Sequence, residues 1–242
     1  DLVIANVRNP ITSGSGGTYA IVTANSSTLT IDQNTSVAAD IFVAGILSGT
    51  NVQPSSLVAG ATGNATVSCP TQNSIPNNAY IEVTFGGGFN VAGVTGASSA
   101  ADINGGLTAT VSGQTVRITR NGAGTAVGAG AIVDDLVIAG AKNPVVSGTT
   151  GVYVIATYYA AGGIIDDDIN VTADTITVGS LSATNVQPAS LVAGAVGNAT
   201  VTFTAANPVP AAYDGPPARA AQRTVPPTDS VAAPSLASSP AS

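Results

Sequence analysis

Residues Leu47 to Val67 occur almost unchanged a second time at Leu181 to Val201, and this repeat constrains the fold more than any other feature. Eighteen of the 21 positions are identical, at an offset of 134 residues. At the same offset the match continues back to the first residue, so that 37 of the 69 pairs between residues 1–69 and 135–203 are identical. An internal repeat of this kind indicates a modular protein whose copies share one fold.

The phase of the repeat divides the chain into one complete unit and two partial ones. A unit that begins at Leu47 occupies residues 47–180, so residues 1–46 correspond to the end of a unit and residues 181–213 to the beginning of one. The first partial repeat therefore lacks the beginning of a unit, and the second lacks the end of one. Residues 214–242 are rich in Pro, Ala and Ser, and we expect them to form an extended tail because proline removes the donors that a central strand needs.

Short segments with alternating apolar and polar residues predict that the complete unit is built from β-strands. Tyr80–Phe85 alternates throughout, and Leu107–Val111 and Thr115–Ile118 flank a Ser-Gly-Gln turn that predicts a hairpin. No helical periodicity lasts beyond two turns. This pattern predicts an all-β fold of antiparallel Ig-like β-sandwich modules, one complete and one incomplete. Further strands are expected at Asn64–Cys69, Ala131–Ile138, Gly151–Thr157 and Asp174–Val178.

The composition argues against several classes of protein. The chain has six basic and thirteen acidic residues, which gives a net charge of −7. It therefore offers no basic surface for nucleic acid. The mean hydropathy is +0.36, but the apolar residues are spread over short segments, and no run of 18 predicts a membrane span. The chain contains no Met, so we expect a processed or partial sequence.

The single cysteine, Cys69, excludes an internal disulfide bond. Its counterpart in the second copy is Phe203, an apolar residue. We therefore expect Cys69 to be a small buried hydrophobic residue. The alternative is a disulfide bridge between two chains.

The residues present give poor support for catalysis. The chain has no His and a single Glu, Glu82, so a Ser or Cys nucleophile would lack its usual base and zinc its commonest ligands. Acidic residues cluster at Asp134–Asp135 and at Asp166, Asp167 and Asp168. We interpret these clusters as solvated turns, with a weak calcium candidate at Asp166 to Asp168, whose spacing matches no EF-hand loop. We predict no enzymatic activity, no catalytic residue and no cofactor.

Five N-x-[ST] sequons are candidate sites for covalent glycans. A secreted chain rich in Thr and Ser could carry a glycan coat at such positions. The alternative is that asparagine serves turns, which its short amide side chain favours. The five asparagines are Asn25, Asn34, Asn64, Asn170 and Asn198.

The beginning of the chain repeats a strand that the second partial repeat does not contain. Asp1–Ala5 is a copy of Asp135–Ala139, which we expect to be a late strand of the complete sandwich. An incomplete sandwich has an open sheet edge, and strand addition from another copy would close it. Because the two surfaces differ, such a contact is heterologous and generates a filament, a head-to-tail homopolymer. The alternative is that residues 1–46 fold back onto residues 181–213 within one chain.

Several sequence strings are similar to an Ig-like repeat of secreted and cell-surface bacterial proteins. These strings are NVQPSSLVAGATGNATVS, YIEVTF, VSGQTVRIT and DLVIAGAKNPVVSGTTGVY. The layout of residues 1–213 resembles that of subunits of extracellular, glycan-coated fibrils that assemble by donor-strand exchange, as pilins do. The resemblance implies a non-enzymatic structural subunit of a pilus-like filament, with an extracellular or cell-surface location. It also implies that the donor strand, at about residues 1–7, inserts Leu2, Val3 and Ile4 into the incomplete sandwich of another subunit.

A different class of function remains open. The chain would then be a monomeric cell-surface adhesion or carbohydrate-binding module. Such a module predicts an exposed aromatic platform, and Tyr158–Tyr159 is the obvious candidate.

Overall fold

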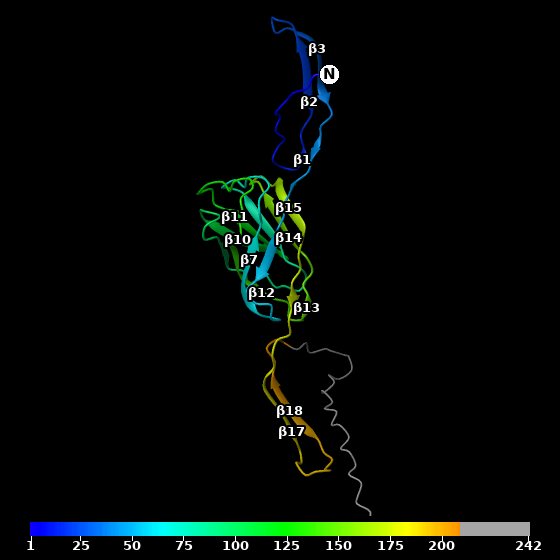
Figure 1. Cartoon of the computed structure of the whole chain (residues 1–242), viewed down its shortest axis with the longest axis vertical. Helices are drawn as coiled ribbons and strands as arrows, with labels where there is room; N and C mark the ends of the chain where they lie inside the picture. The colour runs from blue at the N-terminus through cyan, green and yellow to red at the C-terminus, as the bar shows by residue number, and fades with distance from the viewer. Residues whose placement is uncertain (209–242) are drawn as a thin grey trace, which may run out of the picture. The chain divides into compact units, whose positions relative to one another are not determined.

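The computed structural model describes residues 1–208, in which all regular elements are β-strands (Figure 1). The predicted tail at residues 214–242, and residues 209–213 of the second partial repeat, lie outside the described residues. Within residues 1–208 there is no helix long and apolar enough to cross a membrane.

Two sheets make up the main body of the fold. The larger has six strands and the smaller four, and all neighbouring strands are antiparallel except β15 and β5, which are parallel. The order in the larger sheet is β10 (Leu107–Ser112), β11 (Thr115–Arg120), β8 (Tyr80–Thr84), β14 (Tyr153–Tyr158), β15 (Ile164–Val171) and β5 (Gly45–Ile46). The order in the smaller sheet is β6 (Asn51–Pro54), β7 (Thr62–Ser68), β12 (Leu136–Lys142) and β9 (Gly96–Ser98).

Side chains from both sheets form one hydrophobic core, which makes the fold a β-sandwich. Strand alternation explains which residues it contains: Val116 and Ile118 of β11 are buried while Arg117 between them is exposed. Phe85, Phe89 and Tyr153 meet edge to face or tilted, with ring centroids 5.3 to 5.7 Å apart. The prediction of an antiparallel Ig-like β-sandwich is confirmed, whereas its completion by strand exchange stays a prediction.

The expected strand at Ala131–Ile138 begins later, at Leu136. Two hydrogen bonds divert the chain just before this residue. The backbone N–H of Asp134 donates to the Asp102 carboxylate at 2.9 Å, and the Asp135 carboxylate accepts a bond from the Ala101 N–H at 2.6 Å. Residues 134 and 135 are therefore held by the 99–102 loop, and the regular ladder starts only after them.

Apart from β5, which ends the first partial repeat and belongs to the larger sheet, the strands of the two partial repeats lie outside the sandwich sheets. In the first, β2 (Tyr19–Ala24) pairs with β3 (Thr30–Val37), and β1 (Gly14–Ser15) pairs with β4 (Ile41–Phe42). In the second, β17 (Ser182–Pro188) pairs with β18 (Ala199–Thr204). The counterpart of β1 and β4 in the complete unit is the pair β13 (Gly148–Thr149) and β16 (Thr175–Ile176).

Cys69 is a free cysteine with no exposed surface, as expected for a small hydrophobic core residue. Burial raises the pKa of its thiol to about 12, so the reactive thiolate is scarce at neutral pH. We predict that a maleimide or disulfide reagent leaves the native protein unmodified at pH 8 and labels one thiol per chain after denaturation. Stoichiometric labelling of the native protein would contradict this burial.

Candidate functional site

The hairpin β17–β18 repeats all four residue pairs of β6–β7 and adds one irregular pair, Ser182 with Thr204. Val52 pairs with Val67 in the complete unit, and Val186 pairs with Val201 in the second copy, each 134 residues later. The agreement extends to Pro54 and Ala65, which correspond to the pair Pro188 and Ala199. The repeated sequence therefore specifies the same local strand pairing in both places.

The two hairpins differ in what covers them. Val52 and Val67 are fully buried, whereas 63% of Val186 and 55% of Val201 is exposed. Phe203, the counterpart of buried Cys69, is also half exposed. The β17–β18 hairpin thus presents an apolar face that is part of a sandwich core in its twin.

In the complete unit, β7 pairs with β6 along one edge and with β12 along the other. Leu136 pairs with Val67, Val137 with Thr66, and Ile138 with Ala65. Leu136 and Ile138 are fully buried in the core. The corresponding edge of β18 has no strand paired to it among the described residues, because β18 pairs with β17 alone. A long unpaired edge beside exposed apolar side chains is a surface on which another strand adds readily.

The first partial repeat likewise copies the structure of the end of the complete unit. The β2–β3 pairing matches that of β14–β15, including both irregularities of register. Tyr19 donates a hydrogen bond to Asp40 at 3.0 Å, as Tyr153 does to Asp174 at 2.7 Å. Tyr153 is nevertheless fully buried, while Tyr19 is 41% exposed. Both partial repeats are therefore halves of a sandwich with exposed inner faces.

The predicted donor residues Leu2, Val3 and Ile4 are strongly exposed. They are 90%, 84% and 74% exposed and lie in no strand. In the single chain they are not brought to the edge of β18. Their role as a donor strand stays a prediction.

The run Asp166, Asp167 and Asp168 is not a solvated turn, contrary to our interpretation of the sequence. It lies inside β15, and Asp166 is fully buried. Its carboxylate accepts hydrogen bonds from the backbone N–H and the side-chain Nδ2 of Asn73, at 2.8 and 2.7 Å, and from the Gln72 N–H at 3.2 Å. These bonds replace the water that the charge would otherwise require.

The three carboxylates of this run are not arranged around a common point. Asp168 accepts a hydrogen bond from the Thr50 hydroxyl at 2.5 Å, and Asp167 alternates to the other face of the strand. Among residues 1–208 there is no group of three or more His, Cys, Asp or Glu side chains placed to hold a metal ion. The calcium candidate therefore gains no support from the geometry.

The second acidic cluster, Asp134–Asp135, also has a structural partner. The Asp135 carboxylate accepts bonds from the Ser99 hydroxyl and from the N–H groups of Ala101 and Asp102. Burial on its own would raise the pKa of Asp135, but these hydrogen bonds lower it below the ordinary value. The cluster ties a loop to the start of β12 and does not form a general acid–base pair.

All five sequon asparagines are exposed. Asn25 lies in the turn after β2, where its side-chain oxygen accepts bonds from the N–H groups of Ser27 and Leu29, and Asn34 lies within β3, where its side-chain oxygen accepts a bond from the Ser36 N–H. Exposure makes each residue accessible to a glycosylating enzyme, and glycosylation at these positions stays a prediction.

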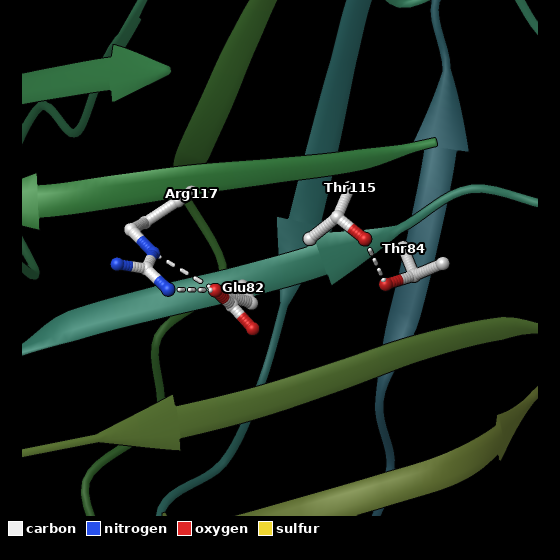
Figure 2. Close-up of polar contacts among 4 residues, drawn as sticks. All are labelled: Glu82, Thr84, Thr115 and Arg117. Carbon is white, nitrogen blue, oxygen red and sulfur yellow. Dashed lines mark hydrogen bonds and ion pairs between the residues drawn. The ribbon is translucent and has the colours of Figure 1, made fainter. Parts of the chain in front are cut away.

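The suggested aromatic platform is largely occupied by protein. Tyr158 stacks on Tyr80, with ring centroids 4.7 Å apart and planes within 9°, and the Arg117 guanidinium lies 4.2 Å from the Tyr80 ring centre. Tyr158 and Tyr159 are both half-buried. Arg117 pairs across the strands with Glu82 at 2.8 Å (Figure 2).

A shallow groove lies beside this pair, on strands β8, β10 and β11. Figure 2 shows the Thr84 and Thr115 hydroxyls facing each other near the Arg117–Glu82 pair. The two hydroxyl oxygens are 2.8 Å apart and share a hydrogen bond. The groove is polar and contains no aromatic side chain. It is lined by Glu82, Thr110, Val111, Ser112, Thr115 and Arg117.

Two buried or hydrogen-bonding residues, Asn143 and Asn73, were given no role from the sequence, and Asp166 was given the wrong one. Asn143 is 4% exposed, and its side-chain Nδ2 donates to the carbonyl oxygens of Ser56 at 2.6 Å and Val58 at 3.0 Å. A signal for them is present in the repeat. Each is identical in the other copy, at Asn9, Asp32 and Asn207, although the residues around them have diverged.

Comparison with known proteins assigns the chain to no family. No protein-family profile and no curated protein sequence matches it. Among solved structures, it is similar to a non-cellulosomal cohesin from the hyperthermophilic archaeon Archaeoglobus fulgidus, at 10% sequence identity and a TM-score of 0.33. The match covers 54% of this chain and 91% of the cohesin. The fold assignment rests on the two packed sheets of the chain itself.

Replacing Asp166 tests its structural role. We predict that Asp166→Ala lowers the free energy of unfolding by about 3 kcal/mol, because the N–H groups of Gln72 and Asn73 lose a buried acceptor. Asp167→Ala, at a half-buried neighbour on the other strand face, is the matched control and should cost less than about 1 kcal/mol. Urea denaturation measures both, and equal effects would show that Asp166 has no special role.

Asp135 should make stability depend on pH in the acid range. Because its folded-state pKa is lowered, its contribution is present above the carboxyl's unfolded pKa and is lost as the pH falls through the folded value. We predict that the difference in urea midpoint between the wild type and Asp135→Asn is largest at pH 7 and shrinks below about pH 4. A difference that does not change with pH would contradict this role.

Proposed function

We propose that this chain is a structural subunit of an extracellular, pilus-like filament. Residues Leu2 to Ile4 of one copy add to the edge of β18 in another. The observation that carries the proposal is the contrast between twin hairpins: β6–β7 is covered by β12, while β17–β18 is exposed and β12 begins with the sequence of residues 2–4.

Burial of the exposed side chains supplies the driving force. Each large aliphatic side chain that becomes fully buried contributes roughly 1.5–3 kcal/mol. Leu2 and Ile4 on one partner and Val186 and Val201 on the other are all more than half exposed in the single chain. The two surfaces are different, so their pairing is heterologous and continues from copy to copy.

The remaining features fit a structural role outside the cell. The chain has no His, and its single Glu is held by Arg117, so the groups that usually carry acid–base chemistry are scarce. All five sequon asparagines are exposed and available to carry glycans. The role requires no cofactor.

The polar groove beside Arg117 favours a second candidate function, a carbohydrate-binding or adhesion module. Its hydroxyl, carboxylate and guanidinium groups suit hydrogen bonds to sugar hydroxyls. Glycan-array binding by the wild type that is lost in Arg117→Ala would support it. No binding to any glycan by the wild type would leave the groove without this role.

Removal of the donor residues tests the filament. We predict that the purified wild type forms filaments by electron microscopy, whereas a variant lacking residues 1–7 and the double variant Leu2→Asp/Ile4→Asp stay monomeric. A charge at either position opposes burial in a core.

Leu29→Asp is the matched control, since Leu29 is an exposed leucine of the same partial repeat whose twin is Gly163. It should assemble normally. Monomers from the wild type would refute the proposal and leave the binding module. Filaments from every variant would keep the structural role but move the contact elsewhere.

A further inference from the structure

We propose that the junction between two copies is a composite half-sandwich with a defined register, which Asn9 and Asp32 of one copy fix. Residues 1–46 of the first copy would pack on residues 181–207 of the second as residues 135–180 pack on residues 47–73 within the complete unit. The inference rests on the proposed function and names the partner as a second copy of this chain.

The pairing of β12 with β7 supplies the register of the donor strand. Transferred by 134 residues, it sets Leu2 opposite Val201, Val3 opposite Thr200 and Ile4 opposite Ala199. In this register Leu2 and Ile4 face the core, as Leu136 and Ile138 do. A slip of one residue would turn both side chains to solvent, so the register is specified by burial.

Asn9 is the first residue that fixes this register. Its twin Asn143 donates from Nδ2 to the carbonyl oxygens of residues 56 and 58 and from its N–H to the Ala61 oxygen at 2.8 Å. These three acceptors belong to the turn between β6 and β7. The same turn occurs between β17 and β18, with its hydrogen bonds from Val192 N–H to Ser190 and from Ala195 N–H to Val192 retained.

Asp32 is the second residue that fixes the register. Its twin Asp166 binds Asn73, and the counterpart of Asn73 in the second copy is Asn207. The backbone N–H of Asp32 donates to the Thr23 hydroxyl at 3.0 Å, as that of Asp166 does to the Thr157 hydroxyl at 3.1 Å. Asp32 therefore already has the strand position of its twin. In the single chain Asp32 is exposed, and the Asn207 amide donates to the Ala59 oxygen at 2.9 Å, a bond that it would exchange for the carboxylate.

The two partial repeats are attached to the complete unit at different residues. The N–H of Ser13 donates to the Ile164 oxygen in β15, whereas the Asn207 amide donates to the Ala59 oxygen in the turn between β6 and β7.

Engineered disulfides test the register. We predict that Val3→Cys/Thr200→Cys, oxidised during assembly, gives a ladder of covalent multimers on a non-reducing denaturing gel, because facing residues on paired strands bring their Cα atoms within the range of about 4.4–6.8 Å that a disulfide needs. Val3→Cys/Val201→Cys, offset by one residue, is the matched control and should give at least tenfold less ladder. The native Cys69 is buried and does not compete.

Each outcome of this experiment decides something. A ladder specific to the first pair supports the junction. A cross-linked monomer at low protein concentration would show closure within one chain and overturn it. Filaments without a ladder, or with equal ladders from both pairs, would keep the proposed function while refuting this register.

A substitution tests the polar contact independently. We predict that Asp32→Asn raises the critical concentration for assembly about tenfold, since the amide replaces one of the two acceptor oxygens with a donor that faces a donor of Asn207, while thermal unfolding of the monomer is unchanged. Asp40→Asn is the matched control, because its twin Asp174 bonds Tyr153 and Thr150 within its own segment, and it should change the critical concentration less than twofold. An Asp32→Asn variant that assembles like the wild type would overturn the assignment.

Discussion

The pairing of β7 with β12 is the interaction on which the rest of the sandwich depends. It joins the beginning of the repeated unit to its end, across more than sixty intervening residues, and places Val67 against Leu136 in the core. Without it, the four-stranded sheet would separate into the pair β6–β7 and the pair β12–β9. The second partial repeat corresponds to β6–β7, and the first to the segment from β12 to β16. In them the hairpins β17–β18 and β2–β3 are formed, and their apolar side chains are exposed.

The repeat therefore lets two contributions to the fold be compared separately: the pairing of strands within a hairpin and the burial of their side chains. Strand pairing within a hairpin is specified locally, because β17–β18 reproduces the four pairs of β6–β7, and β2–β3 reproduces the register of β14–β15 together with both its irregularities. Burial is not local. The same valines are fully buried in one copy and exposed in the other, according to whether a strand and a second sheet lie against them.

This distinction explains what could be predicted from the sequence. Alternation located β8, β10 and β11 closely, and the absence of helical periodicity gave the all-β class. The run at Asp166 was misjudged because three adjacent charges indicate solvent, while the groups that bury and satisfy Asp166 come from Gln72 and Asn73, more than ninety residues away. The start of β12 was misplaced for the same reason, since a distant loop binds Asp134 and Asp135. No local pattern contains such contacts.

Residues 1–46 and 181–207 hold no counterparts of β8 to β11, and this has a mechanical consequence for a junction built from these residues alone. A junction built from residues 1–46 and 181–207 would have fewer strands and a smaller core than the complete sandwich, so the two differ in strength along the same fibre. Under tension the joints would yield first and the sandwiches would keep their fold. Because the separated surfaces retain their strand pairing, they could rejoin once the load is removed. Such a fibre would lengthen under load by opening its junctions and would re-form them afterwards, with every sandwich still folded.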